Sequence, residues 1–338
     1  MKNKRVLLAN RPQGEPDDSC FSFEEIDVPE LEDGQILLKV LWLSLDPYMR
    51  GRMNDVKSYA EPLKIGDVMI GESAGVVIAS TSSRYAVGEY VTAHAGWQTI
   101  LRLDDDSTRL MKVDLNDGSL SAHLGVIGMP GRTAYFGLLE VGNPKAGETL
   151  VVSAASGAVG SVVGQIGKLK GLNVVGIAGG PDKCRYVKEE LKFDYCIDYK
   201  TPNWQEELAA VCPNGIDIYF ENVGGAVMRG VAPLLSKGAR VPICGYISQY
   251  NSEDITNAET PFDVLRQLDQ VPKHRFFVVT EWQDRWVTAT RQLGVWVSEG
   301  KIKYRESIGT GIENAPALLR GLLRGENFGK QLVKIAEQ

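Results

Sequence analysis

A glycine-rich turn carries the residues whose types and spacing best suit chemistry. The stretch from Leu150 to Gly164 reads LVVSAASGAVGSVVG and contains Ala155-x-Gly157-x-x-Gly160. The turn follows a short apolar strand and opens a helix, which is the context of a dinucleotide-binding G-x-G-x-x-G fingerprint with alanine in its first position. Gly157 lets the backbone approach a pyrophosphate, and the helix start offers N–H groups and partial positive charge. A plain glycine-rich turn in an α/β domain is the alternative.

The strand that follows this turn and its helix, the second strand of the fold, indicates which dinucleotide is bound. NAD enzymes usually carry an acidic residue there for the ribose 2′-hydroxyl. Here the strand runs into Ile177-Ala178-Gly179-Gly180 with no carboxylate, and Lys183 follows. Tyr199 offers a hydroxyl nearby. The missing acid and the added cation predict NADPH, although Lys183 alone also suits a solvated lysine at a helix start.

The composition argues against a catalytic metal, which needs about three protein ligands. The candidate ligands of the N-terminal part, Cys20, His94 and His123, have no ligand-like spacing, and both histidines suit structural roles. The five cysteines include no C-x-x-C pair, which predicts reduced thiols and a cytoplasmic protein.

The elements that must position these residues fall into two kinds. Residues 36–100 are β-rich, with strands expected at Ile36–Leu43, Met69–Ile78 and Tyr90–Thr92. Beyond Gly125, strands and helices alternate, which predicts βαβ units. The expected strands there are Thr149–Ser153, Asn173–Ile177, Asp194–Ile197, Gly215–Phe220, Arg240–Cys244 and Arg275–Val279. The expected helices are Thr133–Val141, Gly160–Leu169, Lys183–Leu191, Trp204–Val211, Val227–Leu235 and Asp284–Glu299.

This pattern predicts an α/β protein with a Rossmann doubly wound parallel sheet and a β-rich GroES-like barrel domain. The β-rich catalytic domain is expected over residues 1–125 plus 310–338, and the NADPH-binding domain over residues 126–309. The chain has 338 residues, 43% of them hydrophobic, and a net charge of −6. The negative charge disfavours nucleic-acid binding, and no apolar run reaches the roughly 18 residues of a membrane span.

Five ordered motifs resemble one known family. They are Asp46-Pro47-Tyr48-Met49-Arg50, the fingerprint Ala154 to Gly164, Glu221-Asn222-Val223-Gly224-Gly225, Ile243 to Asn251, and Glu326-Asn327-Phe328-Gly329-Lys330. Together they are similar to the zinc-independent prostaglandin reductase/leukotriene B4 dehydrogenase group of the medium-chain dehydrogenases/reductases, and most of all to bacterial NADPH-dependent curcumin and double-bond reductases. Where zinc-dependent relatives carry metal ligands, this chain has Leu45-Asp46-Pro47 and Gly71-Glu72-Ser73.

The resemblance implies roles for individual residues. Tyr250, Tyr59 and Tyr48 become the candidate catalytic residues, with Tyr250 beside the nicotinamide ribose and the other two lining the substrate cleft; each tyrosine also suits simple packing. The implied assembly is a homodimer. The implied cofactor-binding residues are Gly157, Ala158, Val159, Gly160, Lys183, Tyr199, Asn222, Cys244, Gly245, Tyr250, Phe276, Val278 and Asn327.

The implied reaction is reduction of the C=C bond of a hydrophobic α,β-unsaturated ketone or aldehyde, with hydride to Cβ and a proton to Cα. Without a metal, hydrogen-bond donors must stabilise the enolate oxygen, and a tyrosine or water must protonate Cα. Two alternatives stay open: an NADPH:quinone reductase of the same superfamily and a non-catalytic NADPH-binding sensor.

Overall fold

The computed structural model describes residues 1–56, 60–254 and 257–337, which form two compact units. The first unit contains Met1–Gly125, Glu306–Asn327 and Gln331–Gln338, and the second contains Val126–Arg305 and Phe328–Lys330. The assignment of catalysis to one unit and cofactor binding to the other stays a prediction.

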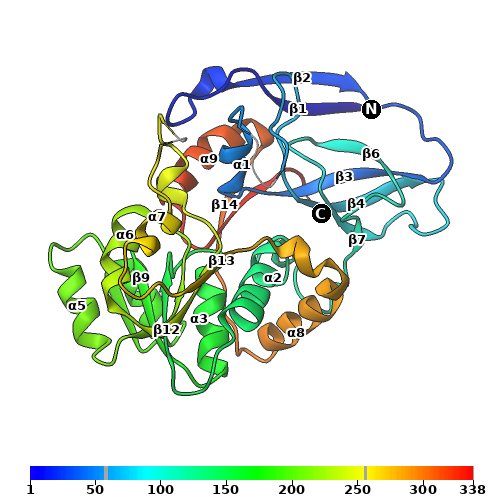
Figure 1. The fold of residues 1–338 in the computed structure, drawn as a ribbon. Helices are drawn as coiled ribbons and strands as arrows, with labels where there is room; N and C mark the ends of the chain where they lie inside the picture. The colour runs from blue at the N-terminus through cyan, green and yellow to red at the C-terminus, as the bar shows by residue number, and fades with distance from the viewer. Residues whose placement is uncertain (57–59, 255–256, 338) are drawn as a thin grey trace. The chain divides into compact units, whose positions relative to one another are not determined.

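The second unit is built on a six-stranded sheet in which every recorded pair of strands is parallel (Figure 1). Its strand order is β10-β9-β8-β11-β12-β13, the order of a Rossmann fold with a switch point between β8 and β11. The predicted doubly wound sheet is therefore confirmed. The strands are β8 (Thr149–Ser153), β9 (Asn173–Ala178), β10 (Tyr195–Asp198), β11 (Ile216–Phe220), β12 (Leu235–Ile243) and β13 (Lys273–Phe276).

Helices pack against this sheet because its strands are apolar on both faces. Val175 and Ile197 share one buried cluster with residues of α5, α6 and α7. Gly176, which points the other way, meets α4, since a Cβ atom added to it would lie 2.9 Å from Val187. The helices are α2 (Met129–Phe136, continued by a π-helical turn, Gly137–Gly142), α3 (Gly160–Leu169), α4 (Pro181–Glu189), α5 (Trp204–Val211), α6 (Gly225–Val231), α7 (Pro261–Arg266) and α8 (Trp286–Ser298).

The predicted boundary between the helix and the strand around Leu235 is wrong. The expected helix Val227–Leu235 ends early: α6 stops at Val231, a 3₁₀ turn follows, and Leu235 already begins β12. The expected strand Arg240–Cys244 is correspondingly longer. Its first half escaped prediction because Lys237 and Gly238 are exposed and interrupt the register, so that Ile216 pairs with Leu235 but Ile218 pairs with Arg240.

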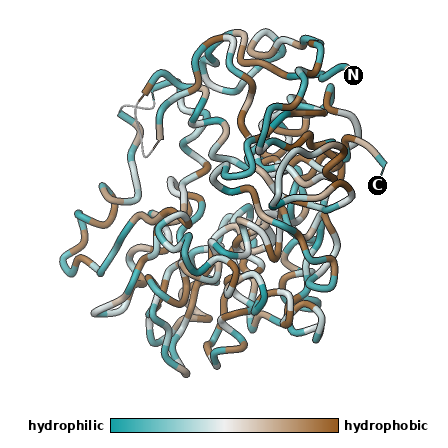
Figure 2. The backbone as a smooth tube through the Cα atoms, turned by 90° about the vertical axis from the view of Figure 1, so that its right-hand side faces the viewer, coloured by the Kyte–Doolittle hydropathy of each residue, from teal (hydrophilic) through white to brown (hydrophobic). Residues whose placement is uncertain are grey.

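The first unit contains a β1–β2 antiparallel hairpin and a seven-stranded sheet ordered β14-β15-β3-β4-β5-β7, with β6 also on β3. The predicted strand Met69–Ile78 begins later, at Ser73. Strand β3 is largely buried. Figure 2 shows hydrophobic (brown) stretches of backbone interspersed with hydrophilic (teal) ones. The elements are β1 (Lys2–Leu8), β2 (Phe21–Asp27), β3 (Gln35–Ser44), α1 (Tyr48–Arg52), β4 (Ser73–Ser80), β5 (Tyr90–Ala93), β6 (Ile100–Asp104), β7 (Met111–Lys112), β14 (Glu306–Thr310), α9 (Ala315–Leu323) and β15 (Lys330–Lys334).

The contact between α3 and the chain beyond α4 gives a stability test. A Cβ atom on Gly164 would lie 1.8 Å from the Phe193 ring, so Gly164→Ala must push the ring or the helix aside. We expect a loss of about 1–3 kcal/mol in the free energy of unfolding, measured by chemical denaturation. Gly51→Ala in α1, where an added Cβ meets nothing within 4 Å, is the control. Equal stability of the two variants would contradict the packing argument.

Candidate functional site

The predicted cofactor residues of the second unit lie where its strands end. The carboxyl ends of parallel strands share one edge of a sheet, and such folds bind ligands there. The fingerprint turn follows β8, Lys183 follows β9, Tyr199 follows β10, Asn222 follows β11, and Cys244 follows β12. One edge of one sheet therefore collects residues that span a long stretch of the chain.

The fingerprint turn is tight and requires small residues. Ala154 has a left-handed φ of 50°, and the Gly157 N–H donates to the Ala154 carbonyl over 2.9 Å. A Cβ atom at Gly160 would lie 2.4 Å from the same carbonyl oxygen, so only glycine fits. At Gly157 the distance is 3.2 Å, which a small shift would relieve. Residues 157–159 stay partly exposed at the start of α3, where helix N–H groups and partial positive charge can meet a pyrophosphate.

The turn after β9 brings together groups suited to a phosphate. Gly179 lies beneath the Tyr199 ring: a Cβ atom there would be 3.0 Å from the tyrosine hydroxyl. Gly180, with a φ of 96°, precedes α4. The Asp198 carboxylate accepts hydrogen bonds from the backbone N–H groups of Gly180 (2.9 Å) and Lys200 (3.0 Å). It is therefore not an unpaired acid that could bind a ribose hydroxyl.

Lys200 is a second cation that the sequence reasoning missed. A Cβ atom on Gly179 would lie 3.1 Å from Lys200 Cε, so Lys200 flanks the same turn as Tyr199. Burial lowers the pKa of Lys183, and the positive charge of Lys200 lowers it further. A buried lysine with a second positive charge beside it suits an anionic ligand. The signal available in the sequence was the position of Lys200 directly after Tyr199.

The buried Glu221 carboxylate joins the ends of three strands. Its Oε1 accepts hydrogen bonds from Val223 N (2.6 Å), Gly224 N (3.0 Å) and Ser153 Oγ (3.1 Å). Its backbone carbonyl accepts from Cys244 N at 2.9 Å. Asn222 is held next to it, with Nδ2 donating to the Ser153 carbonyl over 2.8 Å. Glu221, which was not predicted as a site residue, thus fixes Asn222 at the switch point.

The loop after β12 places Tyr250 over Gly245. The Ile247 N–H donates to the Asn222 carbonyl (3.1 Å), which ties this loop to β11. A Cβ atom on Gly245 would lie 2.9 Å from the Tyr250 hydroxyl, so glycine leaves the room that this hydroxyl occupies. The Tyr246 ring packs edge-on against Tyr250 at 5.8 Å. Burial and the nearby Glu221 raise the pKa of the Cys244 thiol to about 12, so the thiol stays protonated.

Phe276 and Val278 belong to the neighbouring strand end. Phe276 is the last residue of β13 and packs partly buried against the core. The Phe277 N–H donates to the Ile243 carbonyl (3.3 Å), and the Val278 N–H donates to Glu281 Oε1 (2.9 Å). The segment therefore continues along the end of β12, beside Cys244. The predicted strand Arg275–Val279 is shorter than expected, ending at Phe276.

In the first unit, Tyr48 is paired with a histidine. Tyr48 begins α1, and its hydroxyl lies 3.4 Å from His94 Nε2. Burial, followed by the charges of Arg109 and Arg52, lowers the pKa of His94 to about 4, so the imidazole is neutral near pH 7. Tyr59 lies outside the described residues, and Asn327 is the last residue of a segment that belongs to the first unit. Their roles stay predictions.

The charged residues of the Asp46-to-Arg50 motif are structural. The Asp46 carboxylate accepts a hydrogen bond from Ser44 Oγ. The Arg50 guanidinium is buried and donates to the Gly14 carbonyl (2.6 Å) and to Asn54 Oδ1 (2.5 Å). They fix the start of α1 and therefore the backbone that carries Tyr48.

Among the described residues, no group of three or more histidine, cysteine or acidic side chains is arranged to hold a metal ion. His123 contacts the Asp114 carbonyl at 3.2 Å. Across those same parts of the chain, no helix has both the length and the apolar character needed to cross a bilayer.

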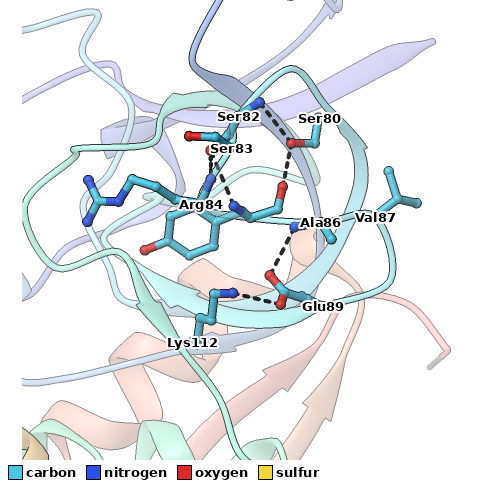
Figure 3. Close-up of a pocket in the computed structure, with 9 residues that line it drawn as sticks. Ser80, Ser82, Ser83, Arg84, Ala86, Val87, Glu89 and Lys112 are labelled. Atoms are coloured by element: carbon cyan, nitrogen blue, oxygen red, sulfur yellow. Dashed lines mark hydrogen bonds and ion pairs between the residues drawn. The ribbon is translucent and has the colours of Figure 1, made fainter.

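A hollow of about 410 Å³ in the first unit is separate from the predicted site residues (Figure 3). Its wall runs from Ser80 to Glu89 and includes Lys112. The polar groups there bond to one another: Ser80 Oγ donates to the Tyr85 carbonyl (2.6 Å), and Lys112 forms an ion pair with Glu89 (2.7 Å). None of the residues predicted to bind cofactor or substrate lines this hollow.

Comparisons with known proteins identify the family. Residues 4–113 match the family model described as the N-terminal domain of oxidoreductase, and residues 158–284 match zinc-binding dehydrogenase. The chain is 47% identical to the NADPH-dependent curcumin reductase of Escherichia coli (strain K12), over 99% of this chain and 97% of the relative. The chain belongs to the medium-chain dehydrogenase/reductase family. The predicted resemblance is thereby confirmed.

Two further matches place this medium-chain dehydrogenase/reductase more closely. Prostaglandin reductase 1 of Rattus norvegicus is 43% identical, over 98% of each chain. The crystal structure of CurA in complex with NADPH from Vibrio vulnificus has a TM-score of 0.92 and 47% identity, covering 99% of this chain and 100% of that one. The predicted combination of a Rossmann sheet with a second, β-rich domain agrees with that structure.

The Glu221 cluster gives a test with a pH signature. Glu221→Leu leaves buried N–H groups without their acceptor, and we expect a loss of about 1–3 kcal/mol in the free energy of unfolding. Glu221→Gln keeps an acceptor oxygen and is the matched control. Burial raises the pKa of Glu221 in the folded protein above its ordinary 4.5. The wild-type chain should therefore lose stability relative to Glu221→Gln as the pH rises above about 4.5. A stability difference between the wild-type chain and Glu221→Gln that is independent of pH would contradict the raised pKa of the buried Glu221 carboxyl group.

Proposed function

We propose that the protein is an NADPH-dependent, metal-independent reductase of C=C bonds conjugated to a carbonyl group, acting on hydrophobic α,β-unsaturated ketones or aldehydes. The observation that carries the proposal is the single sheet edge that combines a dinucleotide turn, a two-lysine phosphate site and the Tyr250 hydroxyl. The names of the curcumin and prostaglandin reductases, matched over nearly the whole chain, support it.

The residues at this edge fit NADPH. The turn around Gly160 has no room for a side chain, which keeps the backbone open for a pyrophosphate. Tyr199 and Lys200 lie against Gly179, and Lys183 is close enough to Lys200 for the two charges to interact. Two cations and a hydroxyl favour a 2′-phosphate over a 2′-hydroxyl at this turn. The remaining proposed cofactor contacts are Ala158, Val159, Asn222, Cys244, Gly245, Tyr250, Phe276, Val278 and Asn327.

When bound, NADPH supplies the hydride for the β-carbon of the substrate. Negative charge then develops on the carbonyl oxygen, and a hydroxyl group that donates a hydrogen bond stabilises it. The Tyr250 hydroxyl, placed over Gly245, is our candidate donor. Tyr59, Tyr48 or water protonates the α-carbon, because a phenol with a pKa near 10 is acidic enough for an enolate. The neutral His94 orients the Tyr48 hydroxyl.

We also propose a cellular setting and an assembly. The five free cysteines favour a reducing cytoplasm. Strand β13 is an edge of the parallel sheet, which suits pairing with a second copy in a homodimer. We further propose that the first unit contributes the substrate-facing residues and the second unit binds the cofactor. Neither a nucleic acid nor a membrane is part of the proposed activity.

The decisive experiment follows NADPH consumption with an alkenone, an alkenal, curcumin, a quinone and a simple ketone, each repeated with NADH and with a chelator. Turnover of the enones with NADPH, unaffected by chelator, is the expected result. Turnover of the quinone alone would instead assign the NADPH:quinone reductase activity. NADPH binding without turnover of any acceptor would favour a sensor.

The two-lysine site makes a prediction about cofactor choice. We expect Lys183→Ala and Lys200→Ala each to raise the KM for NADPH about tenfold or more, because each removes a charge-assisted contact to the 2′-phosphate. The KM for NADH should barely change. The control is Lys188→Ala, because Lys188 is exposed and lies on α4, the helix that carries Lys183. Equal effects on NADPH and NADH would show that these lysines act on folding and not on the phosphate.

A further inference from the structure

Two cysteines lie directly beside the proposed phosphate site. Cys184 follows Lys183 in the first half of α4, and Cys196 lies in β10 two residues before Asp198. Both thiols are free and partly buried. Neither belongs to the proposed reaction, and they are far apart in sequence.

The fold turns both side chains into one layer between α4 and the sheet. Cys196 pairs in register with Gly176, so the two residues face the same side. That side is covered by α4, because a Cβ atom on Gly176 would touch Val187. Cys184 precedes Val187 by three residues and therefore lies on the same face of the helix. The following residue of β10, Ile197, points to the opposite core, as the alternation of a strand requires.

Within this layer the two thiols meet. They share a hydrogen bond, and the Cys184 sulfur also lies 4.0 Å from the Ala178 carbonyl oxygen. The shared hydrogen bond lowers the pKa of Cys184 and raises that of Cys196, so the proton stays on Cys196. Cys184 is therefore the thiol that ionises more readily and the better nucleophile, with a protonated partner at its side.

We propose that Cys184 and Cys196 form a peroxide-sensitive dithiol site whose oxidation to a disulfide weakens NADPH binding. The Cys184 thiol loses its proton, and the thiolate attacks one peroxide oxygen, which breaks the O–O bond and gives a sulfenic acid and hydroxide; the released proton converts the hydroxide into water. The Cys196 thiol then attacks the Cys184 sulfur, forming the S–S bond and releasing a second water. Two thiols lose two electrons, and one hydrogen peroxide is reduced to two waters.

Closure of the disulfide moves the residues that hold the phosphate. Hydrogen-bonded sulfurs must approach to about 2.05 Å, which draws α4 and β10 together. Lys183 is the neighbour of Cys184, while Tyr199 and Lys200 follow Cys196 closely. The Asp198 carboxylate already links the start of α4 to the end of β10 through Gly180 and Lys200. A displacement at this junction therefore reaches all three phosphate-binding side chains. The coupling to NADPH rests on the proposed function, whereas the disulfide itself does not.

The test treats the full-length protein with hydrogen peroxide, blocks the remaining thiols and maps peptides by mass spectrometry. We expect a linked peptide pair containing Cys184 and Cys196, reversed by dithiothreitol. Cys196→Ser should stop at a sulfenic acid on Cys184, trapped by dimedone. Cys184→Ser should leave Cys196 unoxidised. Absence of the linked peptides, or faster oxidation of Cys20, Cys212 or Cys244, would overturn the site.

The second arm measures NADPH affinity by fluorescence before and after oxidation. We expect the Kd of the wild-type protein to rise about tenfold and to recover with dithiothreitol, and the Kd of Cys184→Ser to be unaffected by peroxide. A disulfide that leaves the Kd unchanged would overturn the coupling. If the reduced protein binds no NADPH while the disulfide still forms, the proposed function fails and the dithiol site stands.

Discussion

The buried carboxyl group of Glu221 is the constraint on which the candidate site depends. One carboxyl oxygen accepts hydrogen bonds from two backbone N–H groups and from the Ser153 hydroxyl. The backbone carbonyl of Glu221 accepts a hydrogen bond from the Cys244 N–H. A carboxyl group is costly to bury, and these donors compensate for the lost water. The ends of β8, β11 and β12 are thereby held in one arrangement. Asn222 and the loop that carries Tyr250 take their positions from it.

Much of the second unit could be predicted because its elements repeat a simple pattern. The predicted bounds are confirmed for strand Thr149–Ser153 and for helices Gly160–Leu169 and Trp204–Val211. Short apolar strands and glycine turns mark where these elements begin and end. The start of β12 could not be predicted, because an exposed lysine and a glycine interrupt its apolar pattern. Helix α1 was missed for a similar reason: the five residues Tyr48–Arg52 carry no helical period.

The site was predictable where a residue's chemistry is local and not where it depends on folding. The glycines and Lys183 predict a phosphate site from their residue types and their neighbours in the sequence, and that role stays a prediction. Lys200 and Glu221 do not, because their importance comes from contacts with Gly179 and Ser153, which are distant in sequence. The charges of Asp46 and Arg50 illustrate the reverse: they resemble functional groups but are used to hold backbone.

The segment 328–334 has a consequence for the order in which the two units fold during synthesis. Strand β15 pairs with β3, so the central strand of the first unit lacks one of its neighbours until a segment far downstream in the sequence has been synthesised. The short stretch 328–330 belongs to the second unit, where the Gly329 N–H donates to the Ser156 carbonyl and the Phe328 ring packs on Tyr186. Neither unit is complete until residues 328–334 have been synthesised. Both units therefore finish folding only after this segment is made, and deletion of residues 328–334 removes part of each at once.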